Sequence, residues 1–171
     1  MTEVDIRNSQ PYLLATLYPD ASRPEAQRYR QLATDGVFYE ELMRINGVAS
    51  SARAWGKTEF YKVIFGDCYV RESSALWPGL QRDFPILAAV VEGHAGNALA
   101  LALQRSEADI MIAKVVPALA DALPGVPFLT IHDSVALPSA FAGKAREVIE
   151  ACCIDATGGL RPAIETTLPV K

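Results

Sequence analysis

The spacing of apolar residues predicts a mainly helical chain with strand-like segments near both ends. Residues 4–6 are typical of a short β-strand, and residues 11–17 are typical of a helix or turn. Three amphipathic helices then follow, at residues 24–34, 37–45 and 52–64. The first begins at Pro24 inside a Ser-Arg-Pro-Glu capping box and ends at Asp35-Gly36.

The middle of the chain continues the helical pattern. A short helix is expected at residues 76–84, directly before Pro85. A long helix is expected from Pro85 to about Leu123, with a bend near Pro117, because proline lacks the amide donor that an internal turn needs.

The pattern changes near the C-terminus. Two short apolar strands, residues 126–131 and 135–137, enclose His132-Asp133-Ser134, which predicts a hairpin with an aspartate at its tip. A helix at residues 139–153 and a loose tail after Gly158-Gly159 follow. Together these elements predict an α+β fold with a small antiparallel sheet and a mostly helical lobe.

Composition narrows the class of protein. The chain has 171 residues, of which 50% are hydrophobic and 21% charged, so a folded domain is expected and disorder is excluded. The net charge of −4 argues against strong sequence-independent DNA binding by this chain alone, although it leaves room for a local basic groove.

Cysteines, histidines and hydropathy exclude several further classes. Cys68, Cys152 and Cys153 do not form a disulfide framework, and with two histidines a Cys/His zinc site is not expected. The polar start is not a signal peptide, and charged residues interrupt the apolar region 86–123, so no membrane span is expected. A cytoplasmic protein is the default.

The candidate chemical residues are weak signals when taken singly. Asp5 follows a short strand, and an aspartate such as Asp133 in a hairpin is usually a turn residue. Arg53, Lys57 and Tyr61 recur every four residues and share one helix face, which is usually a solvated stripe. Their order along the chain carries the stronger signal.

Residues 130–137, Thr-Ile-His-Asp-Ser-Val-Ala-Leu, resemble motif C of the family A polymerases and of the phage single-subunit RNA polymerases. Ser134 matches the version of this motif found in the RNA polymerases, because the DNA polymerases usually have glutamate at this position. Residues 53–66 resemble motif B, with Arg53, Lys57, Tyr61, Phe65 and Gly66 in register. Lys62 and Phe65 depart from the glycine and tyrosine that are usual in that motif.

Two looser similarities complete the set. Gln104-Arg-Ser-Glu-Ala-Asp-Ile resembles the glutamine segment that precedes motif C, and Asp83-Phe-Pro resembles an aromatic-proline element after motif B. Asp5 and Ser9-Gln10 resemble motif A, but Pro11 stands where the family usually has the glutamate that helps exclude a ribose. Sugar selectivity therefore stays open.

The resemblance implies template-directed nucleotidyl transfer, with Asp5 and Asp133 as catalytic ligands of Mg²⁺ or Mn²⁺. Two hard carboxylates held close on rigid backbone suit such ions. The resemblance further implies nucleotide binding or contact with nucleic acid for six other residues: Arg53, Lys57, Tyr61, Phe65, Gln104 and His132.

The same resemblance implies a division of the chain and its partners. Residues 1–18 and 70–157 are expected to form a palm-like catalytic core, residues 19–69 a fingers-like lobe, and residues 158–171 a tail. The similarity starts at motif A and leaves no room for a thumb. The expected partners are a primer-template, nucleoside triphosphates, and a second polypeptide or another copy of the chain.

Three hypotheses remain open from sequence. The chain is either a minimal or split polymerase, or a polymerase-derived module that binds nucleic acid or nucleotide without catalysis. The third reading is an unrelated small α+β enzyme whose carboxylates bind a metal for another reaction.

Overall fold

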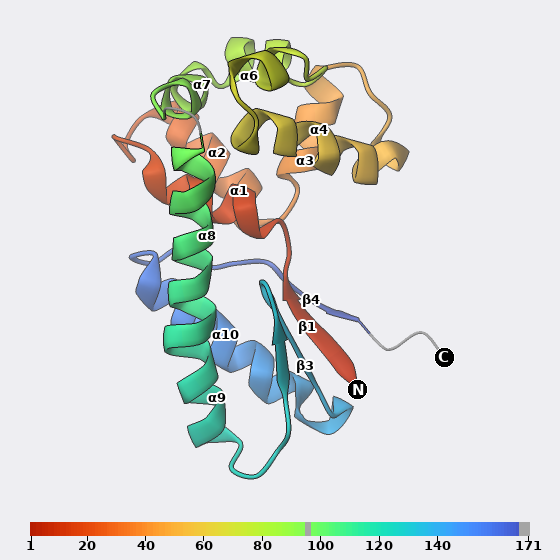
Figure 1. Ribbon diagram of the computed structural model, residues 1–171, viewed down its shortest axis with the longest axis vertical. Coiled ribbons are helices and arrows are strands. Elements are labelled where there is room, and N and C mark those ends of the chain that lie inside the picture. The colour runs from red at the N-terminus through yellow and green to blue at the C-terminus, as the bar shows by residue number, and fades with distance from the viewer. Residues whose placement is uncertain (95–96, 168–171) are drawn as a thin grey trace. The chain divides into compact units, whose positions relative to one another are not determined.

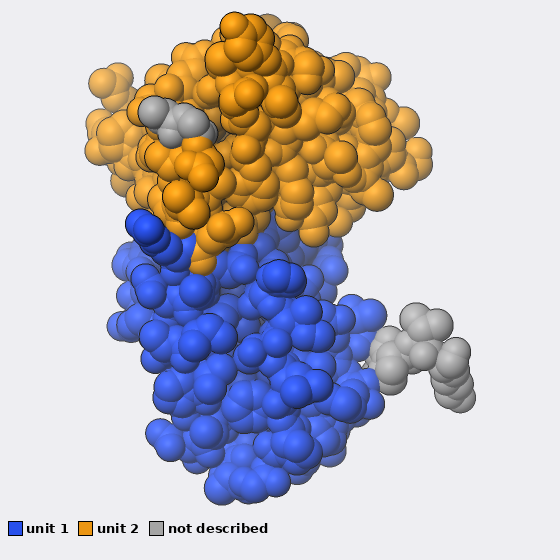
Figure 2. All heavy atoms as spheres, viewed as in Figure 1, with its two compact units in different colours: residues 1–9, 105–171 blue, residues 10–104 orange. Residues whose placement is uncertain are grey.

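The computed structural model describes residues 1–94 and 97–167, and it confirms the predicted α+β class (Figure 1). The chain divides into two compact units, which are coloured separately in Figure 2. Unit 1 consists of residues 1–9 and 105–171, and unit 2 consists of residues 10–104.

This division differs from the expected one. Residues 10–18 and 70–104, which were assigned to the palm-like catalytic core, belong to unit 2 together with the helices of the expected fingers-like lobe. The assignment of palm-like and fingers-like roles stays a prediction. The reason lies in their packing, because Tyr18, Leu80, Phe84 and Leu87 are buried there.

Unit 1 is built on a four-stranded antiparallel sheet with the strand order β2-β3-β1-β4. The strands are β1 (Thr2–Ile6), β2 (Leu129–Ile131), β3 (Ser134–Leu137) and β4 (Ile164–Thr167). The central strand β1 pairs with β3 on one side and with β4 on the other. Chain segments far apart in sequence therefore become neighbours in the middle of the sheet.

Helices cover one face of this sheet (Figure 1). Helix α10 (Ala142–Ala156), entered through a short 3₁₀ turn η4 (Ser139–Phe141), packs on β1 and buries Ala145, Ile149 and Cys153. Val4 and Val135, which are fully buried, lie opposite each other on the central strands. Helix α9 (Val116–Ala122) also packs against α10.

Unit 2 is helical. Its elements are α1 (Ser9–Leu14, whose first residue belongs to unit 1), η1 (Ala15–Leu17), α2 (Pro24–Thr34), α3 (Phe38–Ile45), η2 (Ser50–Ala52), α4 (Arg53–Phe65), α5 (Cys68–Glu72), α6 (Trp77–Asp83), α7 (Pro85–Glu92) and the part of α8 (Ala98–Ile110) that ends at Gln104. Predicted helix 24–34 is confirmed at both ends. Proline fixes its start, and Gly36, at φ 69°, follows its end.

An aromatic cluster forms the core of unit 2. The Tyr29 ring lies 4.7 Å from Phe38 and 6.1 Å from Phe84, measured between ring centroids. Phe60 of α4 lies 5.4 Å from Phe38 in the same edge-to-face manner. All four rings are fully buried, and such pairs stabilise beyond the area they bury. This cluster therefore joins α2, α3, α4 and the start of α7.

The expected continuous helix from Pro85 to Leu123 is wrong. Helix α7 ends at Glu92, and α8 (Ala98–Ile110) begins after a break. Residues 95–96 of the expected helix lie outside the described residues. Alanine and leucine on both sides have high helix propensity, and the expectation gave them more weight than the low helix propensity of Gly93, which directly follows the end of α7.

The expected irregularity near Pro117 takes the form of a π-helical turn, η3 (Met111–Val115), between α8 and α9. The N–H of Val116 donates to the carbonyl of Met111, five residues back. Because Pro117 has no N–H, a wider turn just before it accommodates the lost hydrogen bond.

Two local expectations are also corrected. Residues 164–167 of the expected tail form strand β4, whose Ile164 is buried, while residues 168–171 lie outside the described part. The capping box does not form, because Ser22 donates to Asp20 while the Glu25 carboxylate accepts from the N–H groups of Ile86 and Leu87 at 3.0 and 2.9 Å. Glu25 thus caps α7, which is distant in sequence.

Candidate nucleotidyl-transfer site

Unit 1 brings Asp5 and Asp133 together through main-chain hydrogen bonds. Asp5 lies on β1 and is the register partner of Ser134 on β3. The N–H of Ile6, the residue after Asp5, donates to the carbonyl of Asp133 at 3.2 Å. Cross-strand partners have Cβ atoms about 4.5–5.5 Å apart. The predicted hairpin is present, with Asp133 in its turn, and it adjoins the strand that carries Asp5.

Alternation along β1 gives Asp5 access to the open side of the sheet. Thr2, Val4 and Ile6 are buried on the side of α10. Glu3 and Asp5 therefore point to the opposite face. Asp133 is partly exposed, as Asp5 is. Both residues thus keep part of their surface open to solvent while their backbone is held by the sheet.

Unusual backbone conformation marks the segments beside both aspartates. Within the described residues, the non-glycine positions with positive φ are Asn8 at 56° and His132 at 53°. His132 adjoins Asp133 in the hairpin turn, and Asn8 follows β1. Asparagine and histidine adopt this region more readily than most residues, but the conformation still carries a cost. Sequence reasoning singled out His132 and missed Asn8.

The open face of the sheet carries two further contacts that sequence reasoning missed. The Ser134 hydroxyl lies 2.6 Å from Glu3 Oε1 and 3.0 Å from the carbonyl of Ile131. Arg7 forms an ion pair with Glu165 of β4 at 2.9 Å, and Glu165 is the register partner of Asp5. The sequence signal for the first contact was Glu3, because residues two apart on a strand share a face and Glu3 therefore lies on the same side as Asp5. The second depends on β4, which was not predicted.

Unit 2 places the predicted nucleotide-binding residues along one side of α4. Phe60, Val63 and Ile64 are buried on the other side. Lys57 is exposed, and its ammonium lies 5.5 Å from the centre of the Tyr61 ring. The Tyr61 and Phe65 rings lie 5.1 Å apart. These three side chains therefore form a continuous row that combines one cation with two aromatic rings.

Arg53 begins this row and is held by residues of α3. Its Nε donates to Glu40 Oε1 at 2.8 Å, and its guanidinium lies 5.6 Å from the centre of the Tyr39 ring. The side chains of Arg53 and Glu40 keep 39% and 26% of their exposure, so the pair is open to solvent. Burial is the chief cause that raises the pKa of Tyr39, whose ring lies beside this cation.

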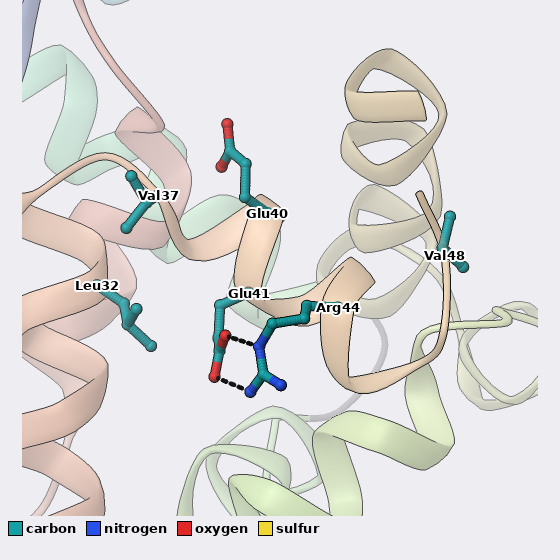
Figure 3. Close-up of a pocket in the computed structure, with 6 residues that line it drawn as sticks. All are labelled: Leu32, Val37, Glu40, Glu41, Arg44 and Val48. Atoms are coloured by element: carbon teal, nitrogen blue, oxygen red, sulfur yellow. Dashed lines mark hydrogen bonds and ion pairs between the residues drawn. The ribbon is translucent and has the colours of Figure 1, made fainter. Parts of the chain in front are cut away.

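A pocket of about 430 Å³ lies beside this pair in unit 2. Its apolar side chains are Leu32, Val37 and Val48 (Figure 3). In Figure 3, Glu40 and Glu41 leave α3 in different directions, and Glu41 pairs with Arg44. The hydrogen bond from Arg44 is the chief cause that lowers the pKa of Glu41 to about 2. Arg28 also donates to Glu41.

The two predicted nucleic-acid contacts are both solvent-exposed. His132 projects from the hairpin turn of unit 1, and Gln104 lies on α8 as the last residue of unit 2. Their exposure is compatible with a role in contacting a polymer.

The pair of aspartates fits the metal expected from the sequence. In the described ranges 1–94 and 97–167, histidine, cysteine, aspartate and glutamate form no group of three or more that could hold a metal ion. Mg²⁺ usually binds through one or two carboxylates and completes its shell with water and substrate phosphates. Two partly exposed aspartates on adjacent backbone segments therefore suit an ion that arrives with a phosphorylated substrate.

Comparison with solved structures confirms the resemblance to the family A polymerase fold. The chain matches the polymerase domain of Pol1 from M. smegmatis, solved in complex with DNA primer-template and dNTP, with a TM-score of 0.65 and 15% sequence identity. The match covers 96% of this chain and 38% of that one, so the chain spans well under half of the solved domain. At this identity the likeness shows the fold alone.

Sequence comparisons add no further assignment. No family model matches the chain, and no curated protein has a significant match to it. Among the described residues, no helix is long and apolar enough to span a bilayer.

Proposed function

We propose that the chain carries out metal-dependent, template-directed nucleotidyl transfer, as a minimal polymerase or as one part of a split one. The observation that carries the proposal is the pairing of β1 with the β2–β3 hairpin, which sets Asp5 beside Asp133. Without this strand pairing, nothing would hold an aspartate on a strand close to an aspartate in a turn that is distant in sequence. The fold match to a primer-template complex supports the same conclusion.

Asp5 and Asp133 would hold Mg²⁺ or Mn²⁺ in this proposal. Bound ions would stabilise negative charge on the attacking and leaving oxygens of an in-line displacement. The primer hydroxyl would form a bond to the α-phosphorus of a nucleoside triphosphate, and pyrophosphate would leave. The protein's part is to hold the two aspartates close together, and the paired main chains of β1 and β3 hold the backbone that carries them.

The row on α4 would bind the incoming nucleotide. Arg53 and Lys57 are one helical turn apart and can both neutralise phosphate charge. Tyr61 and Phe65 would offer ring faces to the sugar or base. His132 would contact a primer phosphate, and Gln104 would reach acceptors in the minor groove, which are similar for all base pairs.

The proposed partners follow from the same surfaces and from the length of the match. A primer-template and nucleoside triphosphates are the ligands, and we place the reaction in the cytoplasm. Because the chain spans 38% of the matched polymerase domain, a second polypeptide or another copy of the chain would supply further surface for gripping duplex.

A second candidate function is a polymerase-derived module that binds nucleotide or nucleic acid without catalysis. The extent of the fold match favours it, because the chain spans 38% of the matched polymerase domain and need not carry all of its catalytic machinery. The net charge of −4 and the engagement of Arg53 by Glu40 would keep the binding of a polyanionic ligand weak. Nucleotide binding without primer extension would make this candidate the leading one.

Primer extension tests the proposal. The full chain, with Mg²⁺ or Mn²⁺ and with dNTPs or rNTPs, should add a few nucleotides to a primer, weakly and with steep salt dependence. Asp133→Asn should abolish the products, because it removes a ligand charge and keeps the shape. Asp121→Asn is the matched control, because Asp121 is exposed on α9, and this variant should extend the primer as the parent does. Extension by Asp133→Asn at the parental rate would remove Asp133 from the site.

A further inference from the structure

We propose that Glu40 is a competing counter-ion that restrains Arg53 and thereby lowers the affinity of the α4 face for nucleotide. The inference rests on the proposed function, because it concerns the nucleotide-binding role of Arg53. The main observation behind the inference is the 2.8 Å hydrogen bond from Arg53 Nε to Glu40 Oε1. A phosphate group of a nucleotide and the carboxylate of Glu40 would compete for the guanidinium of Arg53.

Geometry around the pair supports restraint. Arg53 is the first residue of α4, and Glu40 comes from the neighbouring helix α3, so the contact ties the side chain to a second element. Tyr39 places its ring under the guanidinium at 5.6 Å. Arg53 is therefore held in one orientation on α3 through both its charge and its flat face.

Exposure makes the restraint reversible. Both side chains of the pair are partly open to water, at 39% and 26%. Pairs of this kind contribute roughly 0.2–1 kcal/mol, so a ligand that gains more from Arg53 will displace Glu40. A triphosphate, with several negative charges, is such a ligand. A neutral nucleoside gains nothing from the cation and leaves the pair intact.

The neighbouring residue Glu41 supplies a matched control on the same helix. Its carboxylate is bound by two arginines, Arg28 and Arg44, neither of which lies on the α4 face. Glu41 leaves α3 in a different direction from Glu40 in Figure 3. Removing the charge of Glu41 should therefore leave Arg53 as it was, while the net charge of the protein changes by the same amount.

Binding of deoxyadenosine, dAMP and dATP to the full chain, measured by equilibrium dialysis, tests the inference. Glu40→Gln should bind dATP about two- to fivefold more tightly than the parent, which corresponds to the usual range for an exposed pair. The gain should be smaller for dAMP and absent for deoxyadenosine. It should shrink at high salt, because exposed charges are screened. Glu41→Gln should show no gain.

A double-mutant cycle tests whether the effect passes through Arg53. In an Arg53→Ala background, the substitution Glu40→Gln should no longer change dATP affinity. Urea unfolding of each variant establishes that it is folded. A lower or unchanged affinity in folded Glu40→Gln would overturn the inference and would instead make Glu40 a positioning residue or an irrelevant one.

The same measurements separate this inference from the proposed function. Lys57→Ala, which does not touch the Glu40 pair, should weaken dATP binding if the α4 face binds nucleotide. Weakening by Lys57→Ala with no gain in Glu40→Gln would overturn the inference alone. No dATP binding by the parent, by Glu40→Gln or by any other variant would overturn both.

Discussion

Unit 1 and unit 2 hold their proposed functional residues by different means. In unit 1, main-chain hydrogen bonds between β1 and β3 fix the positions of Asp5 and Asp133. In unit 2, the row on α4 depends on a helix whose reverse side is anchored in an aromatic core, and Arg53 is oriented by side-chain contacts. The carboxylates are therefore set by backbone pairing, and the cations by packing and charge.

The difference has a physical consequence. A substitution on the open face of the sheet changes chemistry while the ladder stays intact, because backbone hydrogen bonds do not involve the side chain. A substitution beneath α4 removes the support of the whole row. The stability of unit 2 should also depend on salt and pH, since the ion pairs of Glu41 and the cap formed by Glu25 contribute to it.

The largest expected effect comes from the anchor beneath the α4 row. Phe60 is fully buried and lies 5.4 Å from Phe38 and 5.6 Å from Tyr39, between ring centroids. Phe60→Ala should lower the free energy of unfolding by about 3–5 kcal/mol, because it leaves a cavity in a close-packed cluster. Urea denaturation followed by circular dichroism measures the loss.

The matched control for this change is Tyr69→Ala on α5, whose side chain is 81% exposed. It removes an aromatic ring of similar size from the surface and should change stability by no more than about 0.5 kcal/mol. Equal losses in the two variants would mean that the aromatic core does not support α4 as described.

The next effect concerns chemistry without stability. Asp5→Asn should weaken Mn²⁺ binding by about a hundredfold. Residues that only orient a metal ligand already change the affinity by about tenfold to a hundredfold, and Asp5 would be a ligand itself. Unfolding in urea should change by less than about 1 kcal/mol, because the ladder of β1 is kept. Titration with Mn²⁺ followed by electron paramagnetic resonance measures the affinity.

Asp121→Asn again serves as the control and should keep the Mn²⁺ affinity of the parent. If Asp5→Asn bound Mn²⁺ as tightly as the parent, the ion would be held elsewhere and the pair of aspartates would lose its proposed role.

Local patterns predicted the elements that carry the proposed site. The two apolar strands around His132-Asp133-Ser134 gave the hairpin, and Pro24 with Asp35-Gly36 gave the bounds of α2. The recurrence of Arg53, Lys57 and Tyr61 placed them on one helix face. Each of these features depends on residues within a few positions of one another, which a single sequence displays.

Features that depend on distant contacts were missed. Strand β4 has one buried residue, Ile164, and forms because β1 offers a free edge for it. Glu25 was interpreted as part of a local capping box, yet its carboxylate binds N–H groups of α7. The bond between Arg53 and Glu40 likewise joins two helices. Nothing in the spacing of these residues specifies their partners.

A smaller effect tests the charge-dependent contacts of unit 2 at Glu25. Its two carboxylate oxygens accept from Ile86 and Leu87 at 3.0 and 2.9 Å. Glu25→Ala should lower the free energy of unfolding by about 1–2 kcal/mol, the usual range for loss of a helix cap. Urea denaturation at neutral pH measures it. Glu147→Ala, on an exposed part of α10, is the control, and a loss as large as that of Glu25→Ala would contradict the capping role.

The smallest effect appears in the pH dependence that Glu41 gives to unit 2. The hydrogen bond from Arg44 is the chief cause that lowers its pKa from 4.5 to about 2 in the folded protein. A lowered folded-state pKa stabilises the protein above the unfolded-state value, and this stabilisation disappears as the pH falls through the folded-state value. The relevant window therefore runs from pH 4.5 down to about 2.

Glu41→Gln should be less stable than the parent by about 1 kcal/mol at pH 7, because its arginine partners are well exposed and screening reduces the contribution of the pair. The difference should shrink through that window and vanish below it, since both proteins then carry a neutral group at this position. Urea midpoints of the parent and the variant, compared at each pH, measure the difference directly and cancel the contribution of the other carboxylates. A deficit that stayed constant from neutral to acidic pH would show that Glu41 stabilises α3 by packing, and that its ion pairs with Arg28 and Arg44 do not contribute to the stability of unit 2.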